Sequence, residues 1–321
     1  NHQGSIDIAF DLIKEAKICG ADAVKFQKRD NKRLYTKSFY DSIYDHRNSY
    51  GKTYGQHRDF LEFDLIQYKE LQAYAKELKI DFFATPFDLP SVEFLEKIDI
   101  PLYKIASADL TNNPLQIEIA KLGKPLIQST GGGTLLDVKR AVETISNINK
   151  NLTILHCTAS YPTTLEDMNL SVIQSYKNEF KNFRIGLSDH QNGIDAAPIA
   201  YMLGARTFEK HFTLNRASKG TDHAFSLEPQ GLLKLVRNLH RIDKMLGSSE
   251  KKLLENEKKP LFKMKKSIVA NKNLAPGCVL KYEDLAFKSP GGGLEPYKFD
   301  QIIGKKIISE IKEDEIISPD N

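Results

Sequence analysis

The first 247 residues are predicted to form an α/β fold: a barrel of parallel strands surrounded by helices, written (β/α)8. Short apolar runs alternate with helix-like stretches here, and such runs are typical of strands buried in a parallel sheet. Polar residues follow every run, which favours a barrel. In an open sheet such residues would gather at the single point where the strand order reverses. Near the C-terminus, short runs divided by Pro and Gly predict a small, mainly β domain.

Each element is expected from its own pattern. Helical spacing of apolar residues predicts helices at residues 6–19, 64–78, 91–98, 134–147, 195–203 and 232–246. Apolar runs predict strands at residues 23–26, 81–84, 102–105, 125–127, 152–155, 184–187 and 207–208. A complete barrel needs one more strand, which we expect before Asn1. The first strand of the barrel is therefore expected to be truncated in this sequence. We expect a barrel domain at 1–247, a charged linker at 248–264 and the small domain at 265–321.

Composition excludes several classes of protein. The formal net charge of +4 is small and scattered, so we expect no binding to nucleic acid. The 3 cysteines are far apart, which favours a reducing compartment, the cytoplasm, without a disulfide framework. No apolar run approaches the roughly 20 residues that span a bilayer, so no membrane segment is expected.

Two histidines, His190 and His211, close two consecutive predicted strands. Neighbouring parallel strands lie about 5 Å apart, so both rings could bind one divalent metal ion such as Mn²⁺, Mg²⁺ or Zn²⁺. The alternative is a pair of hydrogen-bonded histidines at a sheet end. Ser188, Asp189 and Glu209 beside them favour the metal site.

Two lysines, Lys25 and Lys104, end predicted strands at the barrel mouth. An inward lysine there is rarely structural, because its charge would be desolvated without a partner. Binding of an anionic substrate and Schiff-base catalysis are both compatible with it, and the metal site favours anion binding. The glycine-rich stretch 128–134 opens a helix and can be a phosphate site or a plain turn. Asp222, in the loop after the last strand, can accept a ligand hydroxyl or cap a turn.

These residues together resemble the N-acetylneuraminate (sialic acid) synthase family along nearly the whole chain. The run of matches in order carries the resemblance, and no single match would. The matching stretches include Lys25-Phe26-Gln27-Lys28, Gly51-Lys52-Thr53-Tyr54-Gly55, Tyr103-Lys104-Ile105, His156-Cys157-Thr158, Tyr161-Pro162, Ser188-Asp189-His190 and Glu209-Lys210-His211-Phe212-Thr213. The tail, with Pro290-Gly291-Gly292-Gly293, resembles the antifreeze-like (SAF) domain of these synthases.

The resemblance implies a TIM barrel with a SAF domain, assembled as a domain-swapped homodimer. It implies a transferase that condenses phosphoenolpyruvate with an open-chain N-acylmannosamine-type sugar and releases phosphate, with Mn²⁺ or Mg²⁺ held by His190 and His211. The residues that would contact phosphoenolpyruvate are Lys25, Thr85, Lys104, Ser107, Ser129 and Ser188. Those that would face the sugar are Gln27, Tyr161 and Asp222. The chain departs from many relatives at Ser289 of the SAF motif, where they have Arg, and at Ala159, where they have Asn.

The acceptor sugar stays open at this point. A legionaminate or pseudaminate type of synthase, or one acting on a 6-phosphorylated sugar, is compatible with the same residues. A Schiff-base aldolase using Lys25 or Lys104 is a more distant alternative, and a non-catalytic carbohydrate- or ice-binding protein built on the C-terminal domain is another.

Overall fold

The computed structural model describes residues 1–318. The chain divides into two compact units, Asn1–Met245 and Leu246–Asn321, which are described separately. Among the described residues, no helix is both long and apolar enough to cross a membrane.

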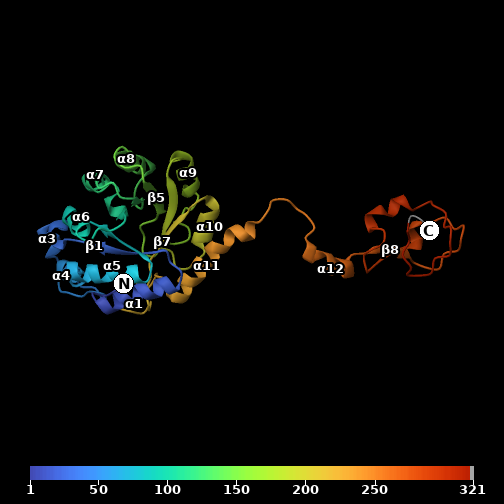
Figure 1. Cartoon of the computed structure of the whole chain (residues 1–321), viewed down its shortest axis with the longest axis horizontal. Coiled ribbons are helices and arrows are strands. Elements are labelled where there is room, and N and C mark those ends of the chain that lie inside the picture. Colours follow the sequence, from blue (N-terminus) through green and yellow to red (C-terminus); the bar gives the residue numbers. More distant parts are fainter. Residues whose placement is uncertain (319–321) are drawn as a thin grey trace. The chain divides into compact units, whose positions relative to one another are not determined.

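The first unit is built on one curled sheet whose strands are all parallel and follow one another in chain order, as Figure 1 shows. Its strands are β1 (Ala23–Lys28), β2 (Asp81–Pro86), β3 (Tyr103–Ile105), β4 (Leu126–Ser129), β5 (Leu152–Cys157), β6 (Arg184–Asp189) and β7 (Thr207–Lys210). This arrangement confirms the predicted α/β fold. Within residues 1–318 no strand joins β7 to β1, so the sheet is a half-barrel, and the strand expected before Asn1 lies outside this sequence.

Most strands run further than their apolar cores predicted. The polar residues expected in the loops, among them Gln27, Thr85, Ser129, Ser188 and Glu209, occupy the last positions of the strands themselves. The cause is that ladder hydrogen bonds continue past the apolar core, which periodicity alone does not detect. These side chains are therefore held by the sheet and not by mobile loops.

Helices follow the strands and cover the outside of the sheet (Figure 1). They are α1 (Ile6–Ile18), α2 (Asn31–Leu34), α3 (Lys37–Tyr40), α4 (Tyr54–Phe60), α5 (Leu65–Glu77), α6 (Leu89–Glu96), α7 (Asn113–Lys121), α8 (Leu135–Ser146), α9 (Val172–Glu179), α10 (Ala196–Leu203) and α11 (Pro229–Leu246), with a 3-10 turn at Ser107–Asp109. The sequence analysis did not predict the short helices α2, α3, α4, α7 and α9. The others correspond to predicted ones.

Local sequence explains where the longer helices begin and which face they bury. Capping boxes at Asp64 and Thr134 start α5 and α8, because each side chain accepts a backbone N–H that has no partner within the helix. Leu71 of α5 and Ile145 of α8 are fully buried in one core with the sheet. Burial of each such side chain contributes about 1.5–3 kcal/mol.

The second unit has a small antiparallel sheet of β8 (Ser267–Ala270) and β9 (Leu285–Lys288), preceded by α12 (Glu255–Met264). The predicted linker 248–264 thus contains a helix. Two 3-10 turns, Tyr282–Asp284 and Pro296–Gln301, complete the unit. Its separate core consists of small and branched side chains, namely Ile268, Ala270, Leu274, Leu280, Leu285, Ile302, Ile307, Ile311 and Ile317.

Candidate functional site

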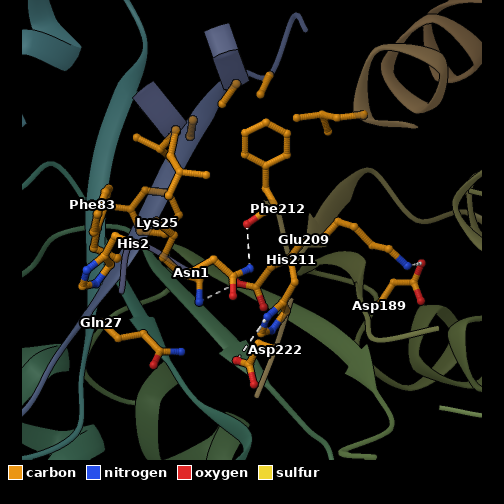
Figure 2. Close-up of a pocket in the computed structure, with 18 of the residues that line it drawn as sticks. Asn1, His2, Lys25, Gln27, Phe83, Asp189, Glu209, His211, Phe212 and Asp222 are labelled. Carbon is orange, nitrogen blue, oxygen red and sulfur yellow. Dashed lines mark hydrogen bonds and ion pairs between the residues drawn. The ribbon is translucent and has the colours of Figure 1, made fainter. Parts of the chain in front are cut away.

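The carboxyl ends of the strands surround a cavity of about 760 Å³. Every residue predicted for the site lines it, and the set is Lys25, Gln27, Thr85, Lys104, Ser107, Ser129, Tyr161, Ser188, His190, His211 and Asp222. A second cavity of about 590 Å³ shares several of these residues. Figure 2 shows Lys25, Glu209, His211 and Asp222 turned toward the same space. The curl of the sheet therefore brings together residues that lie far apart in the sequence.

Glu209 of β7 joins the two lysines. Its carboxylate lies 3.5 Å from Nζ of Lys25 on β1 and 3.5 Å from Nζ of Lys104 on β3. It also accepts a hydrogen bond of 2.7 Å from Oγ of Ser188. Burial has the largest single effect on the pKa of Glu209 and raises it, but Lys104, Lys25, the Ser188 hydrogen bond and His211 together hold that pKa well below its usual value. The carboxylate is therefore ionised, and it orients two ammonium groups toward one cavity.

The sequence analysis noted Glu209 beside the histidines but did not assign it to the site. A signal was present, since side chains two residues apart on a strand point to the same face, and His211 follows Glu209 by two. What the sequence could not provide was the position of Lys104, which comes from a strand four places away in the sheet.

The two histidine rings lie next to each other, with centroids 5.2 Å apart. Nδ1 of His190 lies 3.0 Å from the carbonyl oxygen of Thr158, so it donates there and leaves Nε2 for another partner. Nδ1 of His211 lies 3.5 Å from Oδ2 of Asp222. Burial lowers the pKa of His190 and takes that of His211 to about 3, so both rings are neutral near pH 7.

This pair fits a divalent metal ion on chemical grounds. Neutral imidazole is the form that binds metals, and two rings sharing an ion with bonds of about 2.1 Å have centroids about 5 Å apart. Among residues 1–318, no group of three or more His, Cys, Asp or Glu side chains could hold a metal ion. Within that range the two imidazoles would be the protein's ligands, and any further ligands would be oxygens of substrate or water.

Hydroxyls and glycines form another part of the cavity wall. Oγ1 of Thr85 and Oγ of Ser129 are buried without a hydrogen-bond partner among the described residues. The amide of Gly131 donates to Oγ of Ser107 at 3.0 Å, and a Cβ at this glycine would come within 2.9 Å of that oxygen. Because buried hydroxyls are normally satisfied, this wall fits a ligand rich in acceptor oxygens.

Tyr161 covers the histidines from one side. Its ring centroid lies 4.3 Å from that of His190, while the residue keeps 53% of its surface exposed. Burial of the hydroxyl raises the pKa of Tyr161 to about 12, so the phenol is neutral and can donate a hydrogen bond. An open, aromatic position with a polar tip suits contact with a sugar.

Comparison with known proteins finds family models and relatives that match nearly the whole chain. Residues 12–251 match the model of the NeuB family, and residues 265–321 match the SAF domain. The N-acetylneuraminate-9-phosphate synthase of Mus musculus is 39% identical over 99% of this chain and 89% of its own length. The N,N'-diacetyllegionaminic acid synthase of Campylobacter jejuni is 37% identical over 99% of this chain and 96% of its own.

A solved structure shows the same architecture. The N-acetylneuraminic acid (sialic acid) synthetase of Leptospira borgpetersenii, determined in complex with citrate, has a TM-score of 0.69 and 32% sequence identity. The match covers 81% of this chain and 87% of that one.

Proposed function

Because the chain belongs to the NeuB family and carries a SAF domain, we propose that it condenses phosphoenolpyruvate with an open-chain N-acylmannosamine-type sugar and releases phosphate. Its relatives make sialic, legionaminic or pseudaminic acids, so the chain is a nonulosonate synthase. The observation that carries the reaction is a cavity in which two lysines and two neutral histidines meet hydroxyls that are unpaired within the described part of the chain.

Phosphoenolpyruvate carries both a carboxylate and a phosphate, and the cavity offers complementary groups. Lys25 and Lys104 supply positive charge beside Glu209. Thr85, Ser107, Ser129 and Ser188 supply hydroxyl groups, and those of Thr85 and Ser129 have no hydrogen-bond partner among residues 1–318. These contacts would fix the enol so that its methylene carbon faces the sugar aldehyde, which lowers the entropic cost of bringing the two reactants together.

The sugar would lie between Gln27, Tyr161 and Asp222, which line the same cavity. The side chains of His190 and His211 fit a divalent ion, Mn²⁺ or Mg²⁺, which when bound supplies Lewis acidity toward the aldehyde oxygen. Carbon–carbon bond formation turns the aldehyde oxygen into an alkoxide and leaves a cationic centre at the phosphate-bearing carbon. Water adds to that carbon and loses a proton, while the alkoxide takes up a proton. The bond from that carbon to the phosphate oxygen then breaks, which releases inorganic phosphate and leaves the keto group of the product.

The remaining features of the proposal follow from the resemblance and the composition. We propose that the chain acts as a domain-swapped homodimer in which the SAF unit covers the partner's barrel. A cytoplasmic location agrees with its cysteines, all of which are free thiols in the structure.

One experiment tests the reaction. Phosphate release from phosphoenolpyruvate would be measured with a panel of N-acyl sugars, with and without a chelator. We expect turnover that the chelator abolishes and that His190→Ala lowers by at least two orders of magnitude, because a ligand of the ion is lost. His46→Ala is the matched control, since His46 is exposed and lines neither cavity. Unchanged turnover in His190→Ala would refute the metal role.

One observation favours a second candidate. Burial lowers the pKa of Lys104, as in lysines that form Schiff bases with carbonyl substrates. Incubation with pyruvate and borohydride would trap such an adduct on Lys104. The synthase predicts no covalent adduct.

A further inference from the structure

A loop that follows β7, residues 214–226, borders the site cavity. Its two ends are held together by the barrel unit. A parallel backbone pairing joins Phe212, before the loop, to Leu227, after it. Within the loop, Nδ1 of the buried His223 lies 2.7 Å from Oγ1 of Thr213. These contacts fix the base of the loop but not its tip.

A segment far away in the sequence holds the tip of this loop. The hydroxyl of Tyr50 donates to the carbonyl oxygen of Lys219 at 2.5 Å, across 169 positions of the chain. The ammonium group of Lys219 lies 4.7 Å from the centroid of the Tyr50 ring. The amide of Gly220 donates to Oδ1 of Asn48 at 3.3 Å. We call these three contacts, made by Tyr50 and Asn48, the clasp.

Tyr50 is itself fixed by its neighbours. Its ring stacks on that of Phe60, with centroids 4.7 Å apart and an angle of 6° between the planes. Its backbone amide donates to Nδ1 of His57 at 3.2 Å. Both neighbours belong to α4, so the hydroxyl of Tyr50 projects from a helix-supported position toward the loop.

Asp222 lies between the clasp and the fixed base of the loop. Its Oδ2 is 3.5 Å from Nδ1 of His211, and Figure 2 shows this carboxylate turned toward that ring. Oγ1 of Thr221 donates to Oδ1 of Asp222 at 2.8 Å, and Oγ of Ser226 donates to its carbonyl oxygen at 2.6 Å. Asp222 comes only two residues after Gly220, so a displaced tip would carry the carboxylate with it.

The groups proposed to bind phosphoenolpyruvate do not depend on this loop. Lys25 lies on β1, Lys104 on β3, Ser129 on β4 and Ser188 on β6. The ladder hydrogen bonds of the sheet hold the backbone of each of these residues. Loss of the clasp should therefore affect the acceptor sugar and spare phosphoenolpyruvate.

We propose that Tyr50, together with Asn48, is a positioning residue that holds Asp222 in place for the acceptor sugar. This inference rests on the proposed function, in which Asp222 faces the sugar. Tyr50 acts through the backbone of the loop and not through the reacting atoms. A carboxylate that is already in place needs no ordering when the sugar binds, so the clasp lowers the KM for the sugar.

The test measures KM for phosphoenolpyruvate and for the N-acyl sugar that gives the fastest turnover. Tyr50→Phe keeps the ring and its stacking and removes only the hydroxyl. We expect KM for the sugar to rise about three- to tenfold, the range for one lost hydrogen bond, and KM for phosphoenolpyruvate to change less than about twofold. Tyr44→Phe is the matched control, because Tyr44 belongs to the same segment and lines neither cavity.

Variants of Asn48 separate positioning from direct contact with the sugar. Asn48→Ala should also raise KM for the sugar, although Asn48 lines neither cavity. Asn48→Asp keeps an acceptor oxygen for the amide of Gly220 and should restore the original KM. If Asn48→Ala left KM for the sugar unchanged while Tyr50→Phe raised it, Tyr50 would contact the sugar itself and the inference would be wrong.

Hydrogen exchange of the loop provides a readout that does not depend on turnover. The amides of residues 214–222 should exchange faster in Tyr50→Phe than in the original protein, while those of β6 should not. Unchanged exchange, an unchanged KM for the sugar, or an equal rise in both KM values would overturn the inference. If no sugar supports turnover, the proposed function fails. Calorimetric titration with N-acetylmannosamine then decides the inference, which requires binding to Tyr50→Phe to be weaker by at least about threefold.

Discussion

Replacing Glu209 by Gln should destabilise the barrel unit, and binding of an anion should restore part of the lost free energy of unfolding. The substitution preserves size and keeps an acceptor for Ser188, so it isolates the charge. At 3.5 Å and an effective dielectric constant of about 20, each lysine pair has a gross Coulomb energy of about 5 kcal/mol. Repulsion between the lysines and regained hydration reduce the net effect. Breaking a buried pair costs about 3–5 kcal/mol, and we expect about 3 kcal/mol because the Glu209 side chain is 18% exposed.

The assay is chemical and thermal unfolding of both proteins in an anion-poor buffer. A loss of about 3 kcal/mol corresponds to a fall in Tm of about 6–12 °C for a unit of this size. Phosphoenolpyruvate at a hundred times its Kd would add about 2.7 kcal/mol to the variant. Glu118→Gln is the control, since its pair with Lys121 is exposed and should contribute under about 1 kcal/mol. Exposed ion pairs contribute up to roughly 1 kcal/mol. If the free energies of unfolding of Glu209→Gln and the original protein differed by less than about 0.5 kcal/mol, the pairs would be no stronger than exposed ones and the reasoning would be wrong.

Two further predictions concern the second unit. Asp284 pairs with Lys272 at 2.7 Å and accepts the amide of Lys281 at 2.9 Å, and Lys272 is the largest cause of its lowered pKa. Asp284→Asn should therefore cost about 1–2 kcal/mol at pH 7. Because the folded pKa is depressed, this stability is present above the usual value of about 4 and is lost as pH falls below it, so a melting gap equal at pH 3 and pH 7 would contradict the assignment. Removing residues 246–321 should lower both turnover and dimer content, as measured by phosphate release and light scattering, whereas a fully active monomer would exclude domain swapping.

Much of the fold was predictable because its signals are local. A buried parallel strand is an apolar run, as at 152–155, and an exposed helix repeats its apolar positions every three or four residues, as in α8. The helices α7 and α9 were missed. In α7 the buried face includes a polar residue, Gln116, and α9 buries only Ile173 and Tyr176, so neither gives a clear apolar repeat.

The candidate site was also predictable only in its local features. Which residues stand at the strand ends was readable from the sequence, and all those predicted do line one cavity. Their partners were not readable, because Glu209 meets Lys25 and Lys104 only when β7 curls round toward β1 and β3. Periodicity describes a residue's own element and contains no information on which distant element lies opposite.

By itself, then, the amino-acid sequence determined the order of strands and helices and the chemical character of the barrel mouth. Only the tertiary structure decided that one carboxylate pairs with two lysines and that Arg58 of α4 lines the same cavity as Gln27 and Asp222. The physical reason is that sequence patterns reflect interactions between residues a few positions apart. Electrostatic pairing depends on distances in space, which are set only when the whole chain has folded.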